Sequence, residues 1–87
     1  MLYTKGNTKG KRLVITKSAR REMDHLGMSV QRLVAAIEGG ARKIESRRAG
    51  KWLAQDRFAG KFVLIRYAEL ADKIVVINIG QTTRRAI

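Results

Sequence analysis

Two segments of the chain carry apolar residues at helical spacing. In the clearer one, Val30, Leu33, Val34 and Ile37 follow the i, i+3, i+4, i+7 pattern, which places them on one face of a helix. A thinner stripe, with spacings of four and three residues, runs through Lys17–Leu26. The pattern predicts two short helices, over about residues 17–26 and 29–39.

The residues around these segments are typical of helix ends. Thr16 or Ser18 can cap the first helix and Ser29 the second, because a hydroxyl oxygen accepts hydrogen bonds from the free N–H groups of the first turn. Gly27 ends the first helix at a position suited to a left-handed residue, and a glycine pair at 39–40 ends the second. We therefore expect a compact pair of helices.

From Ala41 onward the period of the apolar positions changes to two, which is typical of β-strands. Tight connections, two of them closed by Gly50 and Gly60, separate segments of strand length. Short strands joined in this way pair antiparallel with their chain neighbours, so the pattern predicts a four-stranded meander. The last two strands are apolar on both faces and should lie at the centre, with helices on one side. The predicted strands are Arg42–Arg48, Lys51–Phe58, Lys61–Ala68 and Lys73–Gly80.

The chain before the first helix divides into two parts. Residues 1–10 are polar, basic and contain glycine, and we expect them to form a flexible basic arm or a frayed edge. Arg12–Ile15 has the aliphatic and β-branched residues of a short strand. Residues 11–87 are therefore predicted to form a single α+β domain, in which two helices pack on an antiparallel four-stranded meander with a short N-terminal strand.

Composition adds a strong indication of the partner. The chain has 19 Lys and Arg against 7 Asp and Glu, a formal net charge of +12. Self-repulsion on this scale opposes compaction, so we expect an anionic partner, most commonly nucleic acid. An acidic protein also fits, whereas no apolar run approaches the roughly 20 residues that cross a membrane. The chain lacks cysteine and a hydrophobic leader, so we expect a cytoplasmic location.

Basic residues around the first hairpin of the meander, on its third strand and at the end of the chain are the candidate phosphate contacts. The first strand of the meander has no clean apolar face, so charge is also expected to protect it as an edge strand. Trp52 can stack on a base, but packing against the sheet accounts for it more simply. The contact candidates are Arg42, Lys43, Arg47, Arg48, Lys51, Arg66, Arg84 and Arg85.

Few residues offer catalytic chemistry. Cleavage of RNA through its own 2′-hydroxyl needs a base, an acid and cations around the phosphorane, and the candidates are Arg66, Tyr67 and His25. His25 also fits a surface histidine beside an acidic neighbour, and Tyr67 a half-buried strand residue with its hydroxyl in water. The carboxylates are scattered, so we expect neither a metal nor a cofactor. An enzyme on this chain would be a metal-independent ribonuclease.

The order of the predicted elements resembles that of the RelE/ParE-like toxin superfamily. The segment ITKSARREMDHLGMSVQRLVAAIEGGARKIE is similar to the opening of a small branch of that superfamily. The later segment GKFVLIRYAELADKIVVINI fits the paired central strands of the same branch, so the resemblance covers about Leu13–Gly80. In the helical part it is carried by Ser18, Ala19, Arg21, Met23, Gly27, Met28, Ser29, Val34 and Ile37.

This resemblance implies a RelE-like fold with nucleic acid as the ligand. The chain departs from the branch at Ser18, where a histidine is common. Its tail, Gln81–Ile87, also lacks the aromatic residue that RelE-type ribonucleases use near the scissile phosphate. We therefore expect a small basic protein that binds RNA or the ribosome, with ribonuclease activity left open. The alternatives are a non-enzymatic DNA-binding protein and a module that binds an acidic antitoxin-like peptide.

Overall fold

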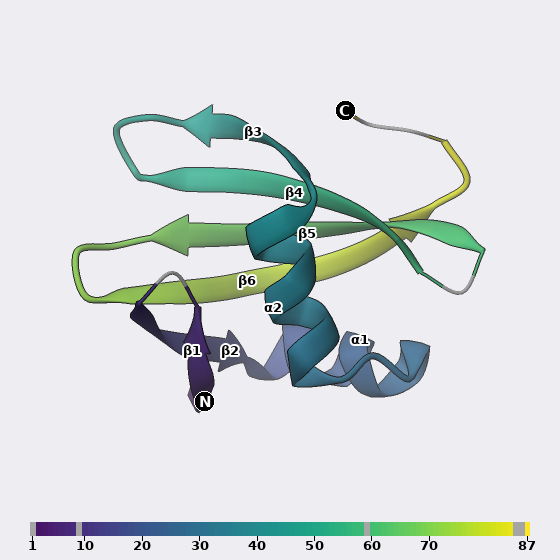
Figure 1. The fold of residues 1–87 in the computed structure, drawn as a ribbon, viewed down its shortest axis with the longest axis horizontal. Helices are drawn as coiled ribbons and strands as arrows, with labels where there is room; N and C mark the ends of the chain where they lie inside the picture. The colour runs from purple at the N-terminus through teal and green to yellow at the C-terminus, as the bar shows by residue number, and fades with distance from the viewer. Residues whose placement is uncertain (1, 9, 59, 85–86) are drawn as a thin grey trace.

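The computed structural model describes residues 2–8, 10–58, 60–84 and 87, and for residues 2–8 the backbone alone. Over these residues the chain is an α+β fold, in which two helices pack on a mixed sheet, as Figure 1 shows. The predicted class and the two predicted helices are confirmed. The elements are β1 (Leu2–Thr8), β2 (Lys11–Thr16), α1 (Lys17–Leu26), α2 (Val30–Gly39), β3 (Ala41–Ser46), β4 (Lys51–Phe58), β5 (Lys61–Glu69) and β6 (Lys73–Thr82).

The sheet has the strand order β1-β2-β6-β5-β4-β3. Strands β3 to β6 follow one another antiparallel, as tight turns between short strands require. β2 pairs in parallel with β6, and β1 pairs antiparallel with β2, which makes the sheet mixed. The apolar strands β5 and β6 therefore lie inside the sheet, and β3 and β1 form its two outer edges.

Both helices begin at the side-chain caps that the sequence offers. Thr16 Oγ1 accepts a hydrogen bond from Ala19 N at 3.2 Å, and Ser29 Oγ accepts one from Arg32 N at 3.1 Å. Gly27 ends α1 in the left-handed conformation, as expected. Each helix has ten residues, and in the described part of the chain neither is long and apolar enough to cross a membrane.

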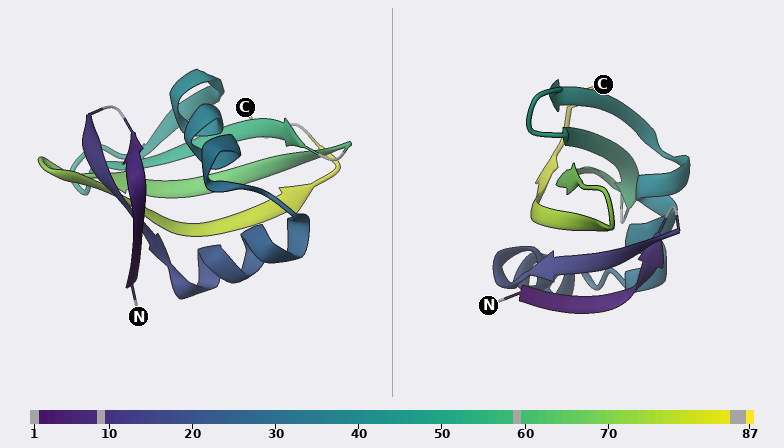
Figure 2. Two further views of the ribbon diagram at one scale, coloured as in Figure 1. Left: turned by 60° about the horizontal axis from the view of Figure 1, so that its bottom comes forward. Right: turned by 90° about the vertical axis from the view of Figure 1, so that its left-hand side faces the viewer.

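The hydrophobic core lies between α2 and one face of the sheet, which curls around this helix (Figure 2). α2 contacts β1 near one edge and β4 toward the other. Leu33 and Ile37 are buried on its inner face, with Val30 and Val34 partly buried beside them, which confirms the predicted apolar stripe. They belong to the same cluster as alternate residues of β5 and β6: Val63, Ile65, Tyr67, Ile74, Val76 and Ile79.

α1 covers the part of β6 that β2 does not reach. β2 pairs with β6 only as far as Val76, and the chain then turns into α1, which continues along β6 (Figures 1 and 2). Thr16 Oγ1 donates a hydrogen bond to Ile77 O at 2.7 Å at this point. Ala19 and Met23 are the fully buried residues of the helix. One threonine therefore caps α1 and anchors it to the sheet.

Arg32 attaches the first turn of α2 to the end of β4. Its Nη2 lies 2.8 Å from Asp56 Oδ2 and donates to Arg57 O at 2.8 Å. The guanidinium carbon also lies 5.7 Å from the centroid of the Phe58 ring. The charge of Arg32 thus serves the packing of a helix on the sheet, and we do not count it among the groups available to an external anion.

The structure differs from the sequence prediction at the N-terminal side of the sheet. Residues 2–8, for which we expected an arm or a frayed edge, form β1. Their polar and glycine residues hide the alternation that marks a strand, and pairing with β2 supplies the backbone hydrogen bonds instead. The parallel pair β2–β6 joins segments about sixty residues apart (Arg12 opposite Lys73), and no turn signal encodes such a pairing.

Two turn glycines allow a matched test of the meander. Gly50 and Gly60 both have positive φ, +64° and +78°, but a Cβ on Gly50 would lie 2.7 Å from Glu69 O whereas one on Gly60 would meet nothing within 4 Å. We expect Gly60→Ala to lower the free energy of unfolding by about 1–2 kcal/mol, the cost of a left-handed alanine. Gly50→Ala should cost more, because the backbone must also move. Urea unfolding of both variants measures the difference, and equal losses would contradict the close approach.

Candidate nucleic-acid interface

The pairing register divides the side chains of β3, β4 and β5 between two faces. Residues opposite one another across an antiparallel pair point to the same side. Ile44, Trp52 and Tyr67 therefore share the face that α2 covers, whereas the other face of these strands carries no helix (Figures 1 and 2). We call this second side the open face. Its residues include Lys43, Lys51, Leu53, Gln55, Arg57, Phe62, Leu64 and Arg66.

A row of three residues crosses the open face. Lys43 on β3 lies opposite Leu53 on β4, and Leu53 lies opposite Arg66 on β5. Adjacent strands are about 4.8 Å apart, so the two cations flank the leucine at a separation of about 10 Å. Leu53 is only 4% exposed although no helix covers it, which fits shielding by the long stems of its basic neighbours. Arg66 Nε also lies 3.0 Å from Glu45 Oε1, whereas Lys43 forms no ion pair with any described residue.

Further cations lie on the same face at both ends of β4. Lys51, at the start of β4, is exposed. Arg57, near its end, is exposed too, and its guanidinium carbon lies 5.9 Å from the centroid of the Phe62 ring. Neither forms an ion pair with any described residue. The open face thus combines separated positive charges with a half-buried aromatic ring, a composition typical of surfaces that bind nucleic acid.

Arg47 and Arg48 lie in the turn after β3, because this strand ends at Ser46, two residues earlier than predicted. Ser46 Oγ accepts a hydrogen bond from Ala49 N at 3.2 Å, and Glu69 N donates to Gly50 O at 2.8 Å. The first bond lies within the turn, and the second attaches the turn to the end of β5. Both arginines are exposed, and in the described part of the chain neither has a carboxylate partner.

Arg42 lies on the helix-covered side of the edge strand and stacks on Trp52. Its guanidinium carbon is 4.8 Å from the centroid of the Trp52 ring. Trp52 is partly buried and packs against the core, as the sequence favoured. Tyr67, opposite Trp52 on β5, is completely buried, so the prediction of a half-buried residue with its hydroxyl in water is wrong. The cause is the curl of the sheet around the core, which leaves this central strand position no access to solvent.

Burial raises the pKa of the Tyr67 hydroxyl above its usual value, and the neighbouring Arg42 guanidinium offsets part of the rise. Because the folded state holds this proton more tightly than the unfolded state, the contribution to stability is complete below about pH 10 and is lost as the pH rises through the folded-state pKa. We expect Tyr67→Phe to remove the late step in tyrosinate absorbance in an alkaline titration. A variant that titrates like the parent chain would contradict this.

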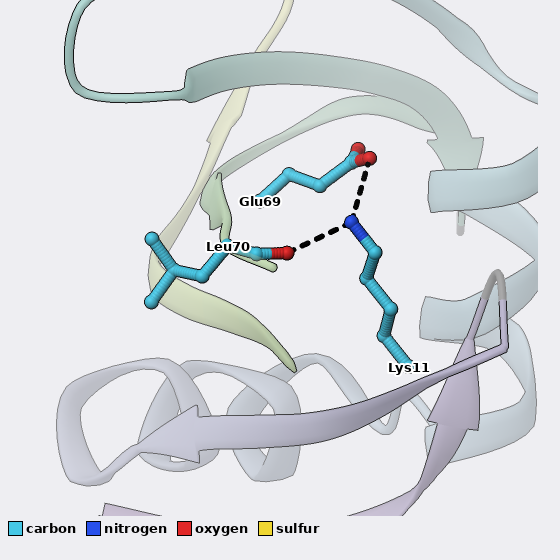
Figure 3. Close-up of polar contacts among 3 residues, drawn as sticks. All are labelled: Lys11, Glu69 and Leu70. Carbon is cyan, nitrogen blue, oxygen red and sulfur yellow. Dashed lines mark hydrogen bonds and ion pairs between the residues drawn. The ribbon is translucent and has the colours of Figure 1, made fainter. Parts of the chain in front are cut away.

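Lys11 on β2 reaches across to the turn between β5 and β6 (Figure 3). Its Nζ lies 3.3 Å from Glu69 Oε2 and donates to Leu70 O at 2.8 Å. Both charged side chains are about three-quarters buried, with 26% and 27% exposed. These two contacts, which we call the Lys11 clamp, tie the parallel strand β2 to the meander. The charge of Lys11 therefore stabilises the fold.

Of the two candidate arginines near the end of the chain, the described one, Arg84, is separated from the other candidates. Arg84 is exposed and follows β6, at the opposite end of the sheet from the turn that carries Arg47 and Arg48 (Figure 1). Arg85 lies outside the described residues. The last residue, Ile87, donates its N–H to Gln55 Oε1 on the open face at 3.0 Å. The backbone of Ile87 therefore lies beside the middle of β4.

The candidate catalytic residues do not converge. Arg66 and Tyr67 are neighbours on β5 and point to opposite faces of the sheet, and Tyr67 is buried. His25 is exposed in the last turn of α1, beside β6. Among the described residues no group of three or more His, Asp or Glu could hold a metal ion. The described residues therefore do not place the three candidates around one point.

Sequence reasoning missed Arg57 and the partners of Arg42. Arg57 could have been found from the turn at Gly60, because counting back from a closed turn gives the register of a regular pair of strands and places Arg57 opposite Phe62. Counting back from the turn at Gly50 does not place Arg42 beside Trp52, because the register of β3 and β4 shifts between Ile44 and Ser46. The clamp formed by Lys11 had no such signal, since its partners lie 58 and 59 residues away.

The fold and the distribution of charge define a small basic α+β domain with an open sheet face and an arginine-bearing turn. Comparison of the chain with family models, with curated proteins and with solved structures finds no match.

Proposed function

We propose that this protein is a small basic nucleic-acid-binding protein, with RNA or the ribosome as its favoured partner. The observation that carries the proposal is the placement of cations that lack an acidic partner among the described residues. Several of them gather at one end of the sheet, on the open face and in the adjoining turn. They are Lys43, Arg47, Arg48 and Lys51.

The physical reason is electrostatic. Like charges held this close repel one another, and the repulsion is relieved when phosphates bind and release their counterions. Cations that serve only the fold are paired here, as Arg32 is with Asp56 and Lys11 with Glu69. The four cations named above have no acidic partner among the described residues. The resemblance of Leu13–Gly80 to RelE/ParE-like toxins supports RNA over DNA. On the basis of the same resemblance, we propose that this chain is related to RelE-like proteins.

Equilibrium binding tests this proposal directly. We would titrate the chain into labelled single-stranded RNA, RNA duplex and DNA duplex of equal length at low salt, and follow fluorescence anisotropy. We expect binding that weakens steeply as the salt concentration rises. Failure to bind any of the three would refute the proposal. Gel analysis of the RNA after incubation decides the separate question of cleavage.

The outer edge of β3 supports a second candidate function. β3 has a neighbour on one side only, so its other edge offers unpaired backbone groups to an added strand. Arg42 and Lys43 on this strand would favour an acidic peptide. Binding of an acidic peptide with no affinity for nucleic acid would select this alternative.

A further inference from the structure

The edge strand β3 presents a layered stack on the side opposite to Lys43. Ile44 lies directly opposite Trp52, and Arg42 precedes Ile44 by two residues, so all three side chains point to the same side. The Arg42 guanidinium lies over the Trp52 ring, with its carbon 4.8 Å from the ring centroid. Beneath this pair, the buried ring of Tyr67 lies opposite Trp52 on the next strand. The order from the core outward is tyrosine, tryptophan, arginine.

The contacts with Trp52 and Tyr67 hold the Arg42 guanidinium in place. One side of the group rests on the indole, and the Tyr67 hydroxyl is close enough for the Arg42 charge to affect its pKa. Arg42 is nevertheless exposed. A fixed, planar, weakly hydrated cation is a surface on which a nucleobase stacks.

The surroundings of the stack fit a base attached to its backbone. Ile44 is 36% exposed, one of the two large apolar side chains that the described residues leave at the surface. It adds an apolar wall beside Trp52, where a base can exclude water. β3 is the outer strand, so no neighbouring strand blocks the approach. Arg47 and Arg48, in the turn that follows β3, are exposed and available to phosphates.

We propose that Arg42, Ile44 and Trp52 form a binding site for an unpaired base of a single-stranded nucleic acid, whose phosphates contact Arg47 and Arg48. This inference rests on the proposed function and specifies its ligand. A duplex keeps its bases stacked on one another and cannot place one on the guanidinium without unstacking it. The site should therefore distinguish single strands from duplexes, which charge alone does not do.

Trp52 is the sole tryptophan of the chain and reports on its own site. We would excite it selectively and titrate the chain with oligo(rU), with oligo(dT) and with a duplex of equal length. Stacking of a base over the Arg42–Trp52 pair should change the tryptophan emission with either single strand, and the two single-stranded arms show whether the site prefers ribose. Duplex binding should leave the emission unchanged.

The variant Arg42→Lys separates stacking from charge, because lysine keeps the positive charge and loses the plane. We expect an affinity for oligo(rU) about five- to tenfold lower, with the salt dependence unchanged and the duplex affinity unaffected. Arg21→Lys on the exposed side of α1 makes the same exchange away from β3 and should behave like the parent chain.

Three outcomes would overturn this inference and leave the proposed function intact. The first is binding of single strands with no change in Trp52 emission, and the second is an Arg42→Lys variant that binds oligo(rU) as the parent chain does. The third is an equal emission change with the duplex. Absence of binding to every nucleic acid would instead remove the proposed function and this site together.

Discussion

Leu33→Ala is expected to lower the free energy of unfolding by about 2–5 kcal/mol. Leu33 is fully buried on the inner face of α2 and belongs to the core that this helix shares with β5 and β6. The truncation removes apolar surface from that core and leaves a cavity that the close-packed neighbours fill only in part. Urea unfolding, followed by the circular dichroism of the helices, measures the loss.

Leu70→Ala provides the matched control, because the same atoms are removed from a side chain that is 38% exposed. The control should change the free energy of unfolding by less than about 0.5 kcal/mol. If Leu33→Ala costs as little as Leu70→Ala, α2 does not pack on the sheet as described. Circular dichroism reports on both helices, so a variant in which α2 alone is unfolded would show a weaker helical signal before urea is added.

The second large effect is expected in the salt dependence of binding. If about five cations contact the phosphates of a duplex, the logarithm of the binding constant should fall against the logarithm of salt concentration with a slope near −4.5. A single strand should give about −3.5 for the same number of contacts. Replacing both Arg47 and Arg48 with alanine should reduce the duplex slope by about two units. It should weaken binding similarly on all sequences, because phosphate contacts carry no base information.

A second double variant, Lys17→Ala with Arg21→Ala, removes the same charge from the exposed side of α1. Because α1 lies along β6 and not near the β3–β4 turn, we expect its slope to stay close to that of the parent chain. Equal changes in the two double variants would show that the ligand responds to net charge alone. The proposed role of the turn would then be wrong, although nucleic-acid binding itself would stand.

The local elements of this fold were predictable because their causes lie within a few residues. The apolar stripe of α2 is a property of spacing, and the caps Thr16 and Ser29 act on N–H groups three residues ahead. The glycines at 50 and 60 fixed two turns of the meander, and tight turns leave antiparallel pairing as the outcome. Strand β4 was predicted to the residue for this reason.

The pairings between distant segments were not predictable, because a strand pattern does not name its partner. From its sequence, β2 could have paired at either edge of the meander. In the structure it lies beside β6, where α1 packs against both strands. β1 formed against the free edge of β2 although its own sequence has weak alternation. The clamp from Lys11 to Glu69 follows from that placement alone.

For the candidate interface, the sequence by itself determined that the chain has an excess of positive charge and which segments carry it. The tertiary structure decided which charges act together. Alternation along a strand puts Arg42 and Lys43 on opposite faces, and only the register with β4 shows that one stacks on Trp52 while the other flanks Leu53. The curl of the sheet buried Tyr67 and so removed it from any surface role. Charge is a sum over residues and can be read from composition, whereas a site is an arrangement in space that exists once the strands have paired.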